Sequence, residues 1–190
     1  TRAVKHLTQR QLVIAADHIR SGGVIAYPTE YCFGLGCNPF NQNAVRKIVH
    51  LKRRSWLEGV IIIAANLVQL RRLVDFDQIR DIDRLTSVWP GPHTWLLPAL
   101  TRVPRWIRGR HDSVAVRITA HRTAVELCRS SGGLLVSTSA NRSGRPPLRH
   151  YTQVRSEFGA ALDFVVEKSV GNANTASSIY DFSTGAMVRK

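Results

Sequence analysis

The sequence predicts one α/β domain over residues 1–190, built around a twisted, mixed sheet with flanking helices. The chain has 190 residues, which is long enough for one sizeable hydrophobic core. Hydrophobic residues make up 44% of it, an ordinary content for a globular protein. Short apolar or alternating stretches, typical of strands, alternate along the chain with stretches of helical periodicity, and this order favours the α/β class.

The first part of the chain predicts a helix, a strand, a loop and a second helix. A capping-box pattern begins a helix at Thr8, and paired glycines at 22–23 end it. Residues 24–27 form a short apolar run typical of a buried strand. Residues 28–36, "PTEYCFGLG", follow as a glycine-punctuated loop that presents a hydroxyl, a carboxyl and an aromatic ring. Helical periodicity returns over 42–53.

The rest of the chain continues to alternate. Further strands are predicted over 60–64, 93–99, 113–119, 134–137, 162–167 and 177–182. Further helices are predicted near 67–74, 78–88, 121–129 and 154–158. The Gly- and Asn-containing stretch 169–176 is predicted to be a mobile loop.

Basic residues dominate the charge of the chain. Lys and Arg number 27 against 13 Asp and Glu, which gives a net charge of +14. Such an excess attracts polyanions, so we expect nucleic acid, nucleotide or phosphate as a partner; the alternative is a basic surface that only aids solubility. No apolar run nears the roughly 18 residues of a membrane span, and the first residues lack a signal-peptide pattern, so we expect a soluble, cytoplasmic protein. Three cysteines predict reduced thiols rather than a disulfide framework.

Four polar clusters are candidates for a binding site, because ligands gather beyond strand ends in open α/β sheets. They are residues 28–30, 52–54, 108–117 and 137–144. Lys52 and Arg54 end a predicted helix, where cations interact favourably with the helix dipole. The alternative is a phosphate clamp, since Arg offers a fork of donors and Lys a compact charge. Residues two apart do not share a helical face, so a shared ligand requires the chain to leave the helix there.

Arg117 lies inside an apolar strand, where a charge is costly unless it is paired or faces a ligand. Asp112 or Asp181 could pair with it; the alternative is a substrate that carries a carboxylate or a phosphate. The hydroxyls of residues 137–143 suit phosphate and ribose oxygens, although turns are rich in Ser and Asn in any case. No Ser-His-Asp order or metal-ligand spacing occurs, so no metal site is expected, and His93 could line the cleft.

Five motifs in matching order and spacing make the chain resemble the YrdC-like family, most closely its short bacterial form. The motifs are "YPTEYCFGLG", "LKRR", "WPGPHT", "SVAVRIT" and "STSANRSG". The likeness extends from about Gln9 to Val188. Three positions depart from the family pattern: Ser55 stands where proline usually follows the K-x-R motif, and Tyr31 and Phe33 stand where threonine and tyrosine are common.

The resemblance implies an open twisted α/β sheet with a basic concave face. It implies a nucleotidyltransferase reaction in which L-threonine, bicarbonate or carbon dioxide, and ATP yield threonylcarbamoyl-AMP and diphosphate. Mg²⁺ would enter with ATP and be bound mainly through the nucleotide's oxygens. Proteins of the TsaD, TsaB and TsaE type would then move the threonylcarbamoyl group to the adenosine next to the anticodon of tRNA, which would lie on the basic face.

The resemblance also implies roles for individual residues. Lys52 and Arg54 would be catalytic and would face the phosphates of ATP. The residues that would hold threonine or its carbamate are Thr29, Arg117, Ser137 and Ser178. The residues that would complete the ATP site are Ser113, Ser139, Asn141 and Ser143.

Two other functions remain open at this point. A non-catalytic basic module that binds tRNA or rRNA would need the positive charge but not this ordered set of polar residues. A carbamoyl-phosphate-handling domain like those of hydrogenase maturation proteins would share the fold. Those domains usually occur in long chains with zinc-finger-like cysteines, which this chain lacks.

Overall fold

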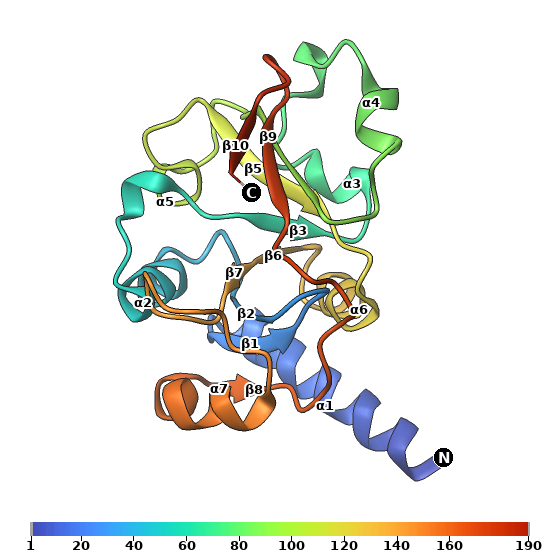
Figure 1. Cartoon of the computed structure of the whole chain (residues 1–190), viewed down its shortest axis with the longest axis vertical. Coiled ribbons are helices and arrows are strands. Elements are labelled where there is room, and N and C mark those ends of the chain that lie inside the picture. The colour runs from blue at the N-terminus through green and yellow to red at the C-terminus, as the bar shows by residue number, and fades with distance from the viewer. Residues whose placement is uncertain (1, 190) are drawn as a thin grey trace.

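A computed structural model describes residues 2–189 and contains two mixed sheets, one in each half of the molecule as drawn in Figure 1. The four-stranded sheet has the order β7-β2-β1-β8, and the six-stranded sheet has the order β10-β9-β4-β5-β3-β6. The strands of the smaller sheet are β1 (Ile25–Pro28), β2 (Phe33–Gly36), β7 (Thr138–Ser139) and β8 (Phe164–Val165). Those of the larger sheet are β3 (Ile62–Ala64), β4 (His93–Pro98), β5 (Ser113–Ile118), β6 (Leu134–Val136), β9 (Ser178–Asp181) and β10 (Met187–Arg189).

Seven α-helices of the described residues flank these sheets (Figure 1). They are α1 (Arg2–Arg20), α2 (Gln42–Lys52), α3 (Leu67–Leu70), α4 (Ile82–Thr86), α5 (Arg105–Arg108), α6 (Arg122–Ser130) and α7 (Tyr151–Phe158). Three short 3-10 helices cover Trp56–Glu58, Phe76–Gln78 and Gly159–Ala161. None of the described helices is long and apolar enough to cross a membrane.

Both pairing directions occur in each sheet, as the predicted mixed sheet requires. In the smaller sheet β1 pairs antiparallel with β2 and parallel with β8. In the larger sheet β5 pairs parallel with β3 and antiparallel with β4. A single residue, Ser137, separates β6 of the larger sheet from β7 of the smaller one, so the chain passes from one sheet to the other at this point.

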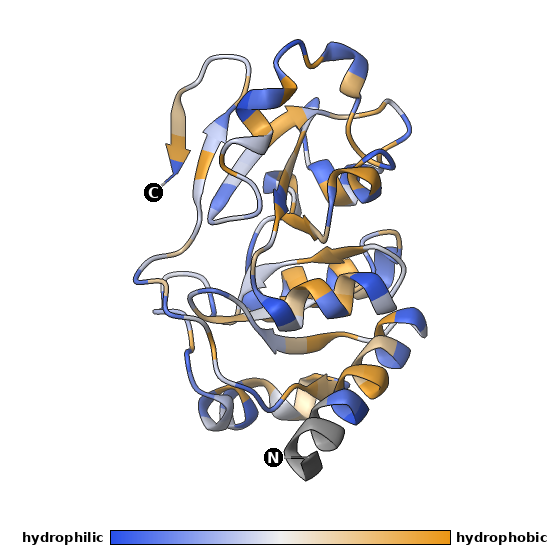
Figure 2. Cartoon of the chain, turned by 90° about the vertical axis from the view of Figure 1, so that its right-hand side faces the viewer, coloured by the Kyte–Doolittle hydropathy of each residue, from blue (hydrophilic) through white to orange (hydrophobic). Residues whose placement is uncertain are grey.

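The hydrophobic core joins the two sheets. One buried cluster contains Phe33 and Leu35 from the smaller sheet together with Ile62, Leu97 and Val116 from the larger one. A second cluster packs α1 and α6 against both sheets. Figure 2 shows that the strands at the centre of the molecule are mostly hydrophobic. Because one core packs against both sheets, the polar residues at the strand ends lie in a fixed arrangement between the two sheets.

The structure corrects three sequence-based expectations about elements. Residues 33–36 form strand β2, all four of them buried, and not a loop. Helix α1 begins at Arg2, so the pattern at Thr8 lies inside the helix and does not cap it. The predicted helices at 67–74 and 78–88 shrink to α3 and α4, while α5 and β10 were not predicted at all.

Two further expectations are confirmed. Helix α2 occupies almost the whole predicted range, with Asn41 as its cap: the Asn41 side chain accepts a hydrogen bond from the backbone of Ala44. Its buried residues include Val45 and Ile48, as the periodicity predicts, whereas Leu51, expected on the same face, is only half-buried. The cysteines Cys32, Cys37 and Cys128 are free thiols and all three are buried.

Candidate active site

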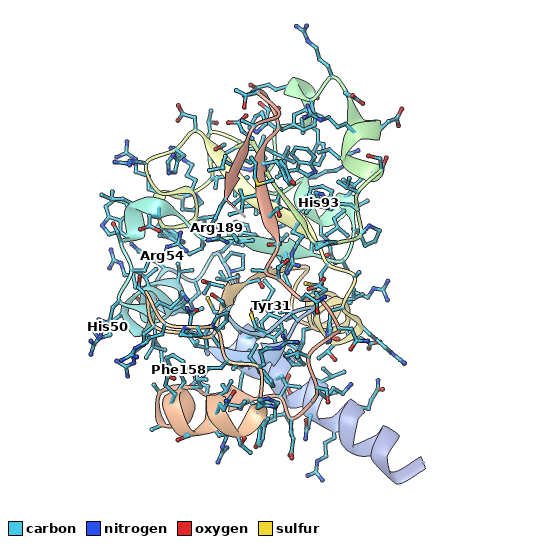
Figure 3. All side chains as sticks on the ribbon, viewed as in Figure 1. Tyr31, His50, Arg54, His93, Phe158 and Arg189 are labelled. Atoms are coloured by element: carbon cyan, nitrogen blue, oxygen red, sulfur yellow. The ribbon has the colours of Figure 1, made fainter. Side chains whose placement is uncertain are left out.

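A pocket with a volume of about 260 Å³ lies where the two sheets meet, and it gathers most of the predicted site residues. The predicted residues that line it are Thr29, Lys52, Arg54, Arg117, Ser137, Ser139, Asn141 and Ser143. Figure 3 labels Tyr31, Arg54 and Arg189, three of its lining residues, between the two halves of the molecule. The pocket is therefore lined by residues that lie far apart in the sequence, from position 29 to position 189.

The end of α2 brings Lys52 and Arg54 to the same pocket. Arg53 follows the helix in the left-handed conformation, with φ of 52°, and its N–H donates to the carbonyl of His50. The chain thereby turns out of the helix between the two basic residues. This is the departure from helical geometry that a shared ligand requires, and it allows both side chains to reach one cavity.

Lys52 is buried, with 6% of its surface exposed, and its ammonium group holds the loop that follows β7. The Nζ atom donates to the carbonyl oxygens of Ser139 at 2.6 Å and Asn141 at 3.0 Å, and to Asn141 Oδ1 at 3.0 Å. In return, the carbonyl of Lys52 accepts the N–H of Ser143. Burial, and after it the charge of Arg54, lowers the pKa of Lys52 from 10.5 to about 8.

Arg54 and Arg189 place two more cations beside Lys52. The Nε atom of Arg54 lies 2.6 Å from Glu58 Oε2. Arg189 lies in β10, the edge strand of the larger sheet, and was not identified from the sequence. This end of the pocket carries three cations and the carboxylate of Glu58, so it suits a polyanion.

The opposite end of the pocket is built on a tight turn after β1. The Thr29 hydroxyl donates to the carbonyl of Cys32 at 2.8 Å, and the Thr29 N–H donates to the same oxygen. Gly34 lies underneath: a Cβ added there would lie 3.3 Å from Thr29 Cγ2 and 3.5 Å from Ser137 Oγ. Glycine at position 34 therefore leaves room beside the Thr29 and Ser137 side chains.

Arg117 pairs with Glu30, and not with Asp112 or Asp181, the two structural partners that the sequence left open. Arg117 Nη1 lies 3.0 Å from Glu30 Oε2, and the two side chains are only 8% and 16% exposed. Asp112 instead faces Arg108 at 3.4 Å, and Asp181 accepts hydrogen bonds from residues 183 and 184. Glu30 engages one of the five N–H donors of the guanidinium group, so donors remain for a ligand in the pocket.

Glu30 itself is held by the end of β5. Its Oε1 atom accepts hydrogen bonds from the Thr119 hydroxyl at 2.7 Å and from the Ala120 N–H at 3.0 Å. Burial alone would raise the pKa of Glu30, but Arg117 and these hydrogen bonds outweigh burial and keep the pKa below its usual value. Glu30 is therefore ionised at neutral pH.

The connection over residues 166–177, between β8 and β9, closes one side of the pocket. Its Gly171 N–H donates to the carbonyl of Thr29 at 2.9 Å, and its Ala173 N–H donates to the carbonyl of Glu30 at 3.0 Å. Thr175, Ala176 and Ser177 from this connection line the pocket. Ser178, the residue expected from the sequence, does not line it; its neighbour Ser177 does.

A second pocket of about 290 Å³ adjoins the first and shares Arg54, Glu58, Ile61 and Arg189 with it. Ser113 lines this second pocket and not the first. Apolar residues make up much of its wall: Val60, Leu96, Ile107, Ala115, Ile179 and Val188. The two pockets together offer a polar site beside a more apolar one. His93 lines neither; it stacks on Tyr180 with ring centroids 5.5 Å apart.

The fold and the site define a class of protein, an α/β protein with one pocket whose two ends differ. One end is cationic, and the other contains an arginine paired with a glutamate and two hydroxyl side chains. A family model described as telomere recombination, for the Sua5, YciO and YrdC proteins, matches residues 17–190. The chain therefore belongs to the Sua5/YciO/YrdC family.

Several similar proteins are named threonylcarbamoyl-AMP synthase. The protein from Nitrosococcus oceani is 51% identical over 176 residues, which are 93% of this chain and 95% of the relative. The protein from Escherichia coli O9:H4 is 46% identical over 185 residues, which are 96% of this chain and 97% of the relative. These matches cover both chains almost completely.

Solved structures support the same family. The crystal structure of P. abyssi Sua5 complexed with L-threonine matches with a TM-score of 0.83 and 34% identity, covering 90% of this chain and 51% of that one. This chain thus spans about half the length of that Sua5. E. coli YciO has a TM-score of 0.83 at 23% identity, covering 96% of this chain and 89% of that one, and shares the fold. Full-length HypF matches at 17% identity with a TM-score of 0.79, which shows a shared fold only. The match covers 93% of this chain and 28% of HypF.

Proposed function

We propose that this chain is an enzyme that joins L-threonine, carbon dioxide or bicarbonate, and ATP into threonylcarbamoyl-AMP, with release of diphosphate. The observation that carries the proposal is the division of the pocket into two ends. Arg117, Thr29 and Ser137 lie at one end and suit an amino acid. Lys52, Arg54 and Arg189 lie at the other and suit a phosphate chain. The names of the relatives at 46–51% identity support the same reaction.

The proposed chemistry needs positioning and charge neutralisation more than a protein nucleophile. The threonine amine, in its neutral form, adds to carbon dioxide and loses a proton to give a carbamate. A carbamate oxygen then attacks the α-phosphorus of ATP, the bond to the bridging oxygen breaks, and diphosphate leaves. Transfers of this kind depend mostly on alignment and on stabilising developing negative charge.

The chain's own residues would supply those two effects. Arg117 would hold the threonine carboxylate with the guanidinium donors that Glu30 leaves unused. Lys52 would keep Ser139 and Asn141 in place through its hydrogen bonds to their loop. Arg54 and Arg189 would offset the charge of the departing diphosphate. Ser113 lines the adjoining pocket, where the apolar wall would suit the adenine ring.

Mg²⁺ fits this pocket only as a companion of the nucleotide. No group of three or more His, Cys, Asp or Glu side chains that could hold a metal occurs in the described part of the chain. Both carboxylates that line the pocket are paired, Glu30 with Arg117 and Glu58 with Arg54, so the oxygens of ATP would supply most of the ligands of the ion. Bound to ATP, Mg²⁺ would neutralise phosphate charge.

We further propose tRNA as a partner and the cytoplasm as the location of the reaction. The net charge of +14 supports attraction to RNA. Proteins of the TsaD, TsaB and TsaE type would receive the intermediate and modify the adenosine next to the anticodon. The same charge also favours the second candidate function, a non-catalytic RNA-binding module.

Diphosphate release by the purified chain tests the proposal. Release from ATP should require both L-threonine and bicarbonate, and omission of either should reduce it to background. A folded chain that binds tRNA but releases no diphosphate under these conditions would contradict the synthase and favour the RNA-binding module. An affinity for tRNA that does not change with salt concentration would contradict electrostatic binding to a basic face.

A further inference from the structure

The two carboxylates of the pocket have different surroundings. Glu58 is 58% exposed, pairs with Arg54 and lines the pocket together with Lys52 and Arg189, so its end of the pocket keeps an excess of positive charge. Glu30 is 16% exposed and faces Arg117 at 3.0 Å, so its end of the pocket is close to electrically neutral. A pocket whose only task were to collect anions would have no use for a buried carboxylate there.

Glu30 is also fixed in place and kept in its charged form. The Thr119 hydroxyl and the Ala120 N–H both donate to Oε1, while Oε2 pairs with Arg117. Its own backbone carbonyl accepts the N–H of Ala173 from the 166–177 connection. Since Glu30 lines the pocket, a ligand held by Arg117 meets this negative charge at close range.

We propose that Glu30 is a specificity-determining residue that makes the Arg117 end of the pocket selective for a zwitterion over a simple anion. The inference rests on the proposed function, in which this end holds L-threonine. A simple anion is attracted by Arg117 and repelled by Glu30, and the two effects largely cancel. An amino acid is favoured because its carboxylate interacts with Arg117 while its ammonium group interacts with Glu30. The phosphate chain of ATP is thereby directed to the Lys52, Arg54 and Arg189 end.

The selectivity can be measured with two ligands of the same shape. L-threonine carries an ammonium group, and 2,3-dihydroxybutanoate of matching stereochemistry carries a hydroxyl group in its place. Calorimetric titration of the full chain with each ligand, without ATP, gives two dissociation constants and their ratio. We expect the wild-type chain to bind L-threonine at least about tenfold more tightly, as one unscreened charge contact allows.

Glu30→Gln should lower that preference by about tenfold or more, because the ammonium group loses its partner and the simple anion loses its repulsion. Glu30→Asp retains the charge and should retain the preference. Glu126→Gln is the matched control: Glu126 forms a surface ion pair with Arg122 on α6, outside the pocket, and its variant should keep the wild-type ratio. Thermal unfolding of each variant checks that it is folded.

Two results would overturn the inference. Glu30→Gln could leave the ratio of the two dissociation constants unchanged, for example by weakening both ligands equally, which would assign Glu30 a packing role only. If Glu30→Gln does not fold, equal affinities of the wild-type chain for both ligands would overturn the inference without any variant. A wild-type chain that binds neither ligand would instead contradict the proposed function itself, and so the two failures are distinguishable.

Discussion

Lys52→Met should abolish most of the activity while leaving the fold nearly as stable as before. The substitution keeps an unbranched side chain that is one atom shorter and removes the ammonium group. Lys52 Nζ donates to three acceptors in the 139–141 loop, at 2.6, 3.0 and 3.0 Å. Two of the acceptors keep another partner: Ser139 O accepts from the Asn141 N–H, and Asn141 Oδ1 accepts from the Ser139 hydroxyl. The substitution therefore leaves the carbonyl of Asn141 as the acceptor that loses its partner.

The two opposing contributions to stability are similar in size. An unsatisfied acceptor costs about 1–3 kcal/mol. The lowering of the Lys52 pKa from 10.5 to about 8 means that the charged side chain is disfavoured in the fold by about 3 kcal/mol, a cost that Met removes. The free energy of unfolding should thus change by no more than about 2 kcal/mol, or roughly 4–8 °C in Tm for a chain of this size. Catalysis should fall by about 100-fold or more, because the loop that carries Ser139 and Asn141 loses its three hydrogen bonds from Lys52 Nζ and is positioned less precisely.

Thermal unfolding and threonine-dependent diphosphate release measure the two quantities. Lys47→Met is the matched control, since Lys47 lies on the same helix but does not line the pocket. Its Nζ atom lies 3.0 Å from Asp163 Oδ2. That variant should keep its activity. A folded Lys52→Met variant with wild-type turnover would refute the reasoning, and so would a variant that does not fold, which would make Lys52 a structural residue.

Three more variants test other parts of the site. Arg189→Ala should raise the KM for ATP about tenfold or more, as expected for the loss of a charged contact, and leave the KM for L-threonine unchanged; an unchanged KM for ATP would remove Arg189 from the nucleotide end. Gly34→Ala should raise the KM for L-threonine more than that for ATP, because the new Cβ lies 3.3 Å from Thr29 Cγ2; equal effects on both would contradict the assignment of that end to the amino acid. The stability that Glu30 gains from a lowered pKa is fully present above its unfolded value of 4.5 and is lost as the pH falls through the folded value. The difference in urea midpoint between wild type and Glu30→Gln should therefore be constant near neutral pH and shrink below about pH 4.5, whereas a difference independent of pH would contradict the ion pair.

The sequence was informative for α2 and β5, where side chains repeat with a clear period, and less so for α3 and α4, which are shorter than predicted. Helix α2 and strand β5 lie where the apolar patterns place them. Strand β2 was missed because two of its four residues are glycines, which leave no alternation to detect. The structure shows why glycine is required: a Cβ at Gly36 would lie 2.5 Å from the Tyr27 ring and 2.7 Å from the carbonyl of Val136. The formation of strand β2 therefore depends on tertiary packing and not on the intrinsic β-propensity of its residues.

The site was predictable as a set of residues but not as a set of contacts. Most of the expected polar residues do line one pocket. The sequence did not indicate Glu30 as the partner of Arg117, because Glu30 lies 87 residues away and no local spacing connects the two. Arg189 was missed because it lies in a three-residue strand whose residues are all exposed, so only its pairing with β9 brings it to the pocket. Long-range pairing of this kind has no periodic signal.

The place of Arg189 in the chain also determines when the pocket can be completed during translation. Residues 25 to 165, which contain every strand except β9 and β10, leave the ribosome first and can begin to pair. Strand β10 follows the other described strands, at the roughly 5–20 residues per second of protein synthesis. A nascent chain from which β10 has not yet emerged would therefore have Arg117 and Glu30 at the proposed amino-acid end, but would lack one cation at the proposed nucleotide end. Such a chain should acquire its full affinity for ATP only after β10 has left the ribosome and paired with β9.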